Sequence, residues 1–246
     1  MKFTKKADSA VTASAGTARL SFLKEQSIKT VFFFAAFFAV IVVTFILLFL
    51  LRDGYPIFSE VGILNFLLGP DWAPTAVVPL YGIFPLIVGT LLVTLGAMVF
   101  AVPLSIGCAI YLSELASPRT KKILKPAVEL LAGIPSVVYG FFGLIVLTNF
   151  IRVSFDISSG ETWLAASVLL GIMALPTIIS VSEDAISSVP HEFKEGSLAI
   201  GATRWQTISR VLVPAALSGI AAAIILGIGR VVGETRAVLK VAGLAF

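Results

Sequence analysis

Charged residues are scarce in this sequence. Only 13% of its 246 residues are charged, whereas 58% are hydrophobic, and the mean hydropathy is +1.02. Soluble domains carry about 25% charged residues, and a soluble fold of this length has no interior large enough to bury so much apolar surface. The shortage of charge therefore excludes a soluble globular protein and predicts an integral membrane protein.

Residues for thiol, metal and nucleotide chemistry are also rare. Cys108 is the only cysteine, which excludes an intramolecular disulfide and a cysteine-based metal site. His191 is the only histidine, which excludes histidine-rich zinc sites and argues against a Ser-His-Asp centre. No Gly-Lys dipeptide occurs, so the sequence has no phosphate-binding P-loop. We expect a protein that is not an enzyme and that holds no cofactor or metal of its own.

Long apolar runs predict the membrane-spanning helices. Val31–Leu51 is a run of 21 residues without a charge and with Thr44 as its one polar residue, about 30 Å of helix, which is the thickness of the hydrocarbon core. A signal-peptide core is shorter, about 7–15 residues, so we expect a retained anchor. Four more spans bring the expected total to five, in an all-α polytopic fold. These spans are Ile83–Leu112, Ile123–Ile151, Trp163–Val181 and Val211–Val232, with bend points expected at Pro103 and Pro135.

The basic residues alternate between the two sides of these spans. In the loops before the fifth span, only Arg52 and Arg152 fall on one side, and positive residues concentrate on the cytoplasmic side of membrane proteins. We therefore predict a cytoplasmic N-terminus, and the net charge of +4 then reflects topology and not a nucleic-acid partner. The basic residues on the predicted cytoplasmic side are Lys2, Lys5, Lys6, Arg19, Lys24, Lys29, Arg119, Lys121, Lys122, Lys125, Lys194, Arg204 and Arg210.

The topology divides the chain into segments. They are a basic cytoplasmic leader at residues 1–30, a first transmembrane anchor at residues 31–51, an outer loop at residues 52–82, and a core at residues 83–246 with a cytoplasmic loop at residues 183–210. The leader lacks apolar periodicity, so we expect it to be disordered and to lie against membrane lipid. Arg236 and Lys240 follow the fifth span on the predicted outer side. Either the chain ends outside, or a further helix that would return it is absent.

The cytoplasmic loop contains signals for two short helices. Pro190 suits the first turn of a helix that ends near Ile200, and Gly201 is a natural C-terminal stop. Thr203 and Gln206 have the spacing of a capping box, which begins a second helix leading into the membrane. We therefore predict a helix, a sharp turn and another helix.

The first of these helices carries an apolar stripe and mixed charges. Phe193, Ser197 and Ile200 are expected on one face, with Lys194 and Glu195 to the side. Helices that rest on a membrane surface are normally rich in lysine and arginine, whereas a mixed-charge helix with an apolar stripe suits a groove in another protein. A protein partner is therefore favoured over lipid headgroups.

This loop resembles the EAA loop of ABC importer permeases. That pattern is Glu-Ala-Ala, three residues, Gly, nine residues and Ile-x-Leu-Pro, and Glu195, Gly201 and Pro214 match it at the same spacing. Gly196 and Ser197 stand where the family has its two alanines. The resemblance implies a coupling helix that sits in a cleft of a cytoplasmic ATPase subunit, through these five residues and Phe193.

Two further stretches resemble the PstC-type permease of phosphate importers. Glu129–Gly140 is similar to a signature of that subunit, and Gly229–Thr235 is similar to its Gly-Arg-x-x-Gly-Glu-Thr segment. The resemblance covers roughly Ile83–Gly243 and implies the type I ABC importer permease (MetI-like) fold. It also implies a second, PstA-like permease, two PstB-like subunits that bind the ATP, and an outer PstS-like phosphate-binding protein. Such permeases normally have six spans, so we expect this chain to be one helix short.

Arg230 and Glu234 are the charges expected at membrane depth. They are four residues apart near the outer end of the fifth span, so they would share one helix face. A charge at this depth costs about 2.5–3.5 kcal/mol on insertion scales. On the residues alone, the pair either snorkels to the outer headgroups or lies on an aqueous path. The resemblance implies the phosphate pathway, where Arg230 would offer donors to phosphate oxygens and Glu234 would hold the guanidinium.

Other functions stay open on the sequence alone. A permease of the same architecture for molybdate, sulfate or an amino acid would carry the same cytoplasmic loop. A stand-alone channel or secondary transporter would work without ATPase subunits and would favour internal repeats, which the sequence does not display. A structural scaffold would leave Arg230 and Glu234 unexplained.

Lys125 and Glu129, one helical turn apart, are expected to form a structural pair.

Overall fold

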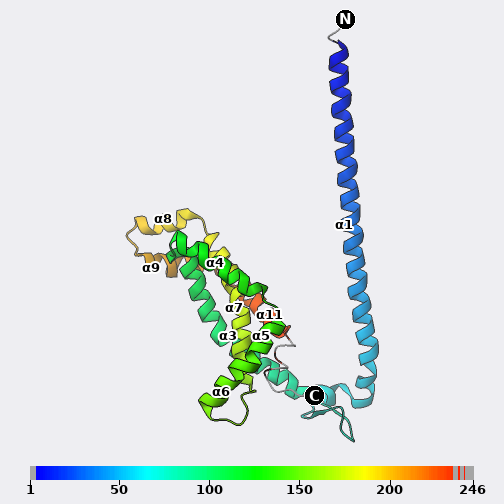
Figure 1. Cartoon of the computed structure of the whole chain (residues 1–246), viewed down its shortest axis with the longest axis vertical. Coiled ribbons are helices and arrows are strands. Elements are labelled where there is room, and N and C mark those ends of the chain that lie inside the picture. Colours follow the sequence, from blue (N-terminus) through cyan, green and yellow to red (C-terminus); the bar gives the residue numbers. More distant parts are fainter. Residues whose placement is uncertain (1–3, 235–237, 239–240, 242–246) are drawn as a thin grey trace. The chain divides into compact units, whose positions relative to one another are not determined.

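The computed structural model describes residues 4–234, 238 and 241. The chain divides into two units, Met1–Ile83 and Phe84–Phe246, and both are built mainly from helices (Figure 1). Within the described residues, four helices are long and apolar enough to cross a membrane, and a bent pair of helices brings the number to five. The prediction of about five spans in an all-α membrane fold is confirmed, with one small β-hairpin added.

In the first unit, α1 (Thr4–Val61) is a single helix of 58 residues. Its apolar part, Ile28–Val61, contains the predicted anchor and has the length and hydropathy of a membrane span. The prediction that the leader is disordered is wrong, because the helix extends back to Thr4. The leader has no proline and is rich in alanine and lysine. Helix that starts in the anchor can therefore propagate toward the N-terminus.

The segment after α1 has its own local structure. Gly62, with a φ of +79°, separates α1 from α2 (Ile63–Leu68). The strands β1 (Trp72–Ala73) and β2 (Leu80–Tyr81) then pair antiparallel, and the rings of Trp72 and Tyr81 meet edge to face with centroids 6.3 Å apart. The predicted outer loop thus contains a short helix and a hairpin in which two aromatic rings pack across the strands.

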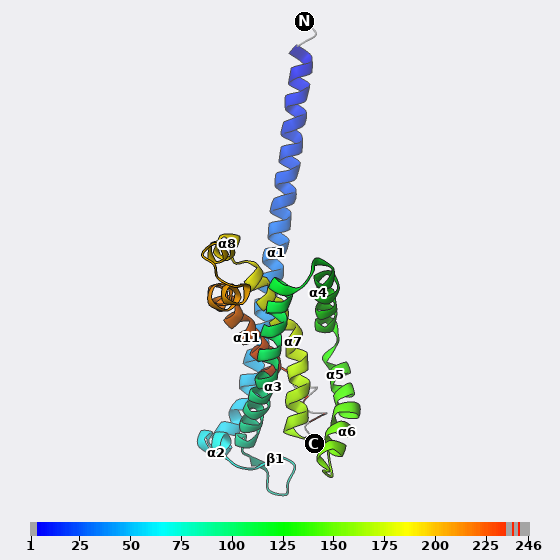
Figure 2. The ribbon, with the colours of Figure 1, turned by 90° about the vertical axis from the view of Figure 1, so that its left-hand side faces the viewer.

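In the second unit, α3 (Phe84–Ile110) and α7 (Trp163–Ser187) pack along their lengths (Figure 2). Small residues permit the close approach, since a Cβ added at Gly171 would lie 3.2 Å from the carbonyl oxygen of Ala97. Ser167 Oγ donates to the Val93 carbonyl at 3.2 Å, which adds an interhelical hydrogen bond in the buried interface. The spans predicted at Ile83–Leu112 and Trp163–Val181 are both present, and α7 continues past Val181 to Ser187.

The third predicted span, Ile123–Ile151, is wrong in its first part. The chain forms α4 (Pro118–Gly133), breaks, and resumes in α5 (Ser136–Phe142), a π-helical turn at Gly143–Leu147 and α6 (Thr148–Phe155). Ile134 is extended before Pro135, as expected for a residue that precedes proline. The apolar span therefore runs from Ser136 to Phe155, and the predicted bend at Pro135 is a complete break.

The fifth predicted span, Val211–Val232, is also broken. A π-helical turn (Ile208–Leu212) leads into α10 (Val213–Ala215), and α11 (Leu217–Val232) continues at an angle of 69° to the preceding helical segment. Pro214 has no N–H to continue the ladder, and Ala216 adopts a φ of −89° and a ψ of 4°. These two positions account for the change of direction.

Candidate functional site

The loop between α7 and α11 folds as its local signals predict. α8 (His191–Ala199) begins after Pro190, and Gly201 turns the chain with a φ of +86°. α9 (Arg204–Thr207) then begins with a complete capping box, in which the Thr203 hydroxyl accepts from the Gln206 N–H at 3.3 Å and the Gln206 side chain accepts from the Thr203 N–H at 2.9 Å. Figure 1 shows α8 and α9 at the same end of the second unit as α4, and Figure 2 agrees for α8.

Ser197 fastens α8 to α9. Its hydroxyl lies 3.0 Å from the hydroxyl of Thr207, which in turn donates to the Thr203 carbonyl at 3.1 Å. The Ala202 N–H donates to the Ser197 carbonyl across the turn at 3.3 Å. Ser197, expected on the same face as Phe193 and Ile200, is buried, whereas those two residues are exposed, and it braces the loop from inside. A small residue is required here because the two helices are close.

Large apolar side chains remain exposed on the outside of this braced loop. Ile200 is 87% exposed, Trp205 66% and Phe193 53%. Glu195 and Gly196 are exposed on the same short helix, α8. Exposed apolar residues on a rigid, short, mixed-charge helix are typical of a surface that binds another protein.

The remaining residues of the predicted loop site are placed differently. Gly201 is exposed at the turn, and Pro214 is exposed in α10, beyond the second helix of the loop. A hollow beside Phe193 is lined by the end of α7 and by Ala215 and Ala216. The structure thus gathers Phe193, Glu195, Gly196, Ser197 and Gly201 on α8 and its turn. It places Pro214 at the entry to α11.

An ion pair that sequence analysis missed connects α8 to the end of α3. Lys194 Nζ donates to Glu114 Oε2 at 2.5 Å. Glu114 lies in a π-helical turn, Tyr111–Leu115, that directly continues α3. The Glu114 side chain is only 11% exposed, so it faces the protein and not solvent.

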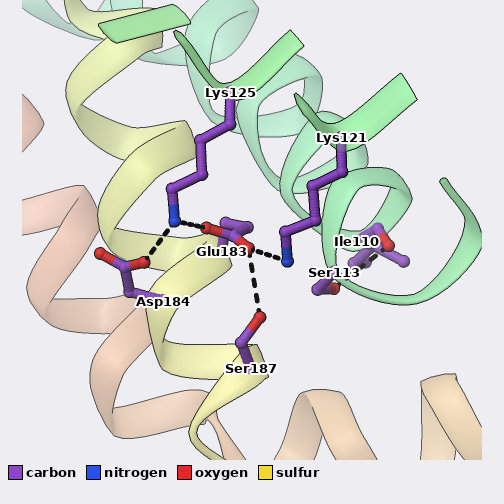
Figure 3. A network of polar contacts seen from close by, with 7 residues as sticks. All are labelled: Ile110, Ser113, Lys121, Lys125, Glu183, Asp184 and Ser187. Atoms are coloured by element: carbon purple, nitrogen blue, oxygen red, sulfur yellow. Dashed lines mark hydrogen bonds and ion pairs between the residues drawn. The ribbon is translucent and has the colours of Figure 1, made fainter. Parts of the chain in front are cut away.

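A second polar cluster joins α4 to α7 (Figure 3). Glu183, on α7, is 1% exposed, and its two carboxylate oxygens lie 2.5 Å from Lys121 Nζ and 2.5 Å from Lys125 Nζ. Lys125 also reaches Asp184 at 2.9 Å, and the Ser187 hydroxyl donates to Glu183 at 3.2 Å. The buried carboxylate is therefore fully partnered, as a charge removed from water must be.

This cluster corrects two predictions from the sequence. The Lys125 ammonium is directed to Glu183 and Asp184, and not to Glu129 on its own helix. Glu183 and Asp184 belong to α7, so the loop begins after Ser187 and not at residue 183.

The hydrogen bonds from Lys125 to Glu183 and then to Asp184 raise the pKa of Lys125 above its ordinary value.

Arg230 points to α7 from the last turn of α11. Its Nη1 donates to Thr177 Oγ1 at 3.1 Å, a partner that sequence analysis did not identify. Glu234 lies beyond Val232, the last residue of α11, so the prediction that Arg230 and Glu234 share one helix face is wrong. The Glu234 N–H instead bonds to the Val231 carbonyl at 3.2 Å, which closes the end of the helix. Arg236 and Lys240 lie outside the described residues.

The braced loop, the helices that flank it and Arg230 lie in the part of the chain that matches a known family. Residues 101–245 match the family described as binding-protein-dependent transport system inner membrane component. This match covers more than half of the chain, so the chain belongs to that family of ABC transporter permeases. The family consists of membrane permeases and not of enzymes, and its fold is the MetI-like helical fold predicted from the sequence.

The chain is also similar to individual permeases of this family. The probable ABC transporter permease protein YqgH of Bacillus subtilis is 48% identical over 180 residues, 73% of this chain and 58% of the relative. The phosphate transport system permease protein PstC of Mesorhizobium japonicum is 36% identical over 200 residues, 74% of this chain and 61% of the relative. PstC of Pasteurella multocida is 34% identical over 232 residues, 87% of this chain and 72% of the relative. The chain spans about three fifths of the length of the first two.

Proposed function

We propose that this chain is a permease subunit of an ATP-driven importer of inorganic phosphate. Relatives that carry the name phosphate transport system permease protein PstC are 34–36% identical over most of the chain, which supports the substrate. Its partners are a second, PstA-like permease, two PstB-like ATPase subunits that bind and hydrolyse the ATP, and an outer PstS-like phosphate-binding protein. The N-terminus is cytoplasmic, so the loop between α7 and α11 faces the ATPases.

The observation that carries the ATP-driven part of the proposal is the geometry of this loop. Ser197 and the Thr203–Gln206 capping box make α8, its turn and α9 one braced body. Phe193 and Ile200 are exposed on that body, where they are available to a groove of a partner. A rigid element with an apolar surface is what force transmission requires, because a flexible loop would absorb the movement of the ATPases. Closure of the ATPase pair on ATP would displace α8 and reverse the side to which the pathway opens.

Arg230 is the residue proposed to meet the anion. Its guanidinium offers several N–H donors in a plane, which suits the oxygens of phosphate. The contact with Thr177 involves Nη1 and directs the side chain toward α7, and the other donors of the fork are proposed to meet a passing anion. Glu234, just beyond the end of α11, is proposed to limit the attraction, so that phosphate is passed on and not trapped.

A permease of the same architecture for another substrate is the second candidate. Sulfate and molybdate are tetrahedral oxyanions and would accept the same hydrogen bonds from Arg230. An amino acid would present only one carboxylate to it. The names of the relatives favour phosphate, whereas the α8 loop is compatible with each of these substrates.

Uptake measurements in a bacterial host test the proposal. The host lacks its own PstC-type permease but retains the PstA-like, PstB-like and PstS-like proteins, and this chain is supplied in its place. We expect uptake of labelled phosphate that is lost when the P-loop lysine of the ATPase is replaced, with little competition from sulfate or molybdate. A host in which a PstC relative restores uptake and this chain does not would contradict the proposal. Uptake that persists without a functional ATPase would favour a stand-alone transporter.

A further inference from the structure

The ion pair between Lys194 and Glu114 crosses from the α8 loop to a membrane-spanning helix. Lys194 lies in the middle of α8, and Glu114 lies in the π-helical turn that extends α3. Their side-chain atoms are 2.5 Å apart, which is a short, charge-assisted hydrogen bond. The pair therefore joins the loop to a helix about 40 Å long, at 1.5 Å per residue, that runs through the second unit.

The other side-chain tether of α8 stays within the loop. Ser197 bonds to Thr207 of α9, and in the part of the chain that the structure describes no other side chain of α8 forms a hydrogen bond or ion pair. Among the described residues, Lys194 is thus the polar side chain through which α8 contacts a helix outside the loop. A displacement of α8 reaches α3 at this point.

The low exposure of the Glu114 side chain distinguishes this ion pair from an ordinary surface pair. Its carboxylate is mostly withdrawn from water, and a carboxylate in that position needs a partner charge. The pair also borders a hollow lined by Leu115, Leu198 and Arg204, which leaves space for the side chains to move together. Exposed pairs such as Glu25 and Lys29, on α1, lack this protection, and pairs of that kind contribute little.

The π-helical turn that carries Glu114 continues α3 without a break, since Ile110 between them keeps helical φ and ψ angles. In Tyr111–Leu115 the hydrogen bonds depart from the α pattern, and such turns are frequent at functional sites. Before this turn, α3 is held against α7 by close packing at Gly171 and by the Ser167 hydrogen bond to Val93. A pull on Glu114 would therefore act on α3 and α7 together.

We infer that Lys194 and Glu114 form the link by which movement of α8 is passed to α3 during transport. This inference rests on the proposed function, in which α8 is the element moved by the ATPases. Both are assigned as positioning residues, which act through the two helices that they join. Without the pair, α8 can still bind the ATPases, but its movement is transmitted less completely to the helices that line the pathway.

Purified complexes in proteoliposomes test the link, with phosphate transported per ATP hydrolysed as the readout. Lys194→Met and Glu114→Gln each remove one charge, and the double variant Glu114→Lys/Lys194→Glu restores a pair with reversed polarity. Lys122→Met removes an exposed lysine of α4 and is the control. We expect each single variant to assemble and hydrolyse ATP while the ratio falls about tenfold. The reversed pair should restore most of the wild-type ratio, and the control variant should have the wild-type ratio.

A cross-linking variant covers the case in which single substitutions prevent assembly. Glu114→Cys and Lys194→Cys are introduced together with Cys108→Ser and joined by a reducible bifunctional reagent before purification. We expect normal coupling while the link is intact and a lower ratio after reduction. Equal ratios in the linked and reduced complexes, or single variants within about twofold of the original ratio, would overturn the inference. Wild-type complexes without phosphate uptake would instead contradict the proposed function.

Discussion

Glu183 on α7 and Lys125 on α4 lie 2.5 Å apart, although 58 residues separate them in the sequence. Lys121, one turn before Lys125, binds the other oxygen of the same carboxylate. The two lysines point inward from α4, while Ile123 and Leu130 on the same helix are exposed. The cluster thus fastens an amphipathic helix outside the spans to the central helix of the core.

Neutralising Glu183 is predicted to destabilise the second unit. Glu183→Gln removes the carboxylate that holds two lysines, and we expect a loss of about 1–3 kcal/mol. Asp184→Asn is the matched control, since Asp184 is exposed and its carboxylate contacts one lysine, Lys125, within the described residues; we expect less than about 1 kcal/mol. Thermal unfolding in detergent, followed by size-exclusion chromatography, measures both. Equal melting temperatures for the two variants would show that the buried carboxylate has no special role.

The stabilising effect of Lys125 is predicted to be independent of pH in the neutral range. Its folded-state pKa is raised above the ordinary value of 10.5, so its contribution is complete below that value and is lost only as the pH rises through the folded pKa. We therefore expect the difference in melting temperature between wild type and Lys125→Met to stay constant from about pH 6 to pH 9. A difference that shrinks between neutral pH and pH 9 would indicate that the raised pKa is wrong.

The two glycines of the loop are predicted to respond oppositely to the same change. Gly196 lies inside α8, and a Cβ added there would have no neighbouring atom within 4 Å, so Gly196→Ala should stabilise the helix by about 1 kcal/mol and preserve uptake. Gly201 has a φ of +86°, where a Cβ costs about 1–2 kcal/mol, so Gly201→Ala should distort the turn and reduce uptake. Parallel measurements of melting temperature and phosphate uptake check both, and a harmless Gly201→Ala would contradict the role given to the turn.

How far the sequence predicts this protein depends on the range of the interactions. The α8 turn was predictable from Pro190, Gly201 and the Thr203–Gln206 capping box because each signal acts over a few residues. Pro135 indicated a bend. The residues around it do not distinguish a bent span from a complete break that leaves α4 outside the apolar span.

The contacts between distant segments were not predictable in the same way. Nothing near Glu183 identifies Lys121 and Lys125 as its partners, and nothing near Lys194 identifies Glu114. The burial of Ser197 depends on how α8 and α9 pack, which helical periodicity alone does not specify.

Arg230 provides the sharpest test of the substrate pathway. Arg230→Gln keeps a polar side chain but removes the positive charge, and we expect phosphate uptake to be abolished while the complex still assembles and binds ATP. Thr177→Val keeps the size of the side chain and removes only the acceptor that orients Arg230. Losing a hydrogen bond worth about 1 kcal/mol should raise the phosphate concentration for half-maximal uptake about fivefold, without abolishing transport.

Concentration-dependent uptake in proteoliposomes, with ATP hydrolysis measured on the same samples, separates these effects. Arg230→Lys serves as the control for charge, because it keeps the cation and loses the planar fork, and it should recover only part of the uptake. Normal uptake by Arg230→Gln would remove Arg230 from the pathway. A Thr177→Val variant that loses assembly would assign the Thr177 contact to helix packing, since an orienting hydrogen bond affects transport and leaves the complex intact.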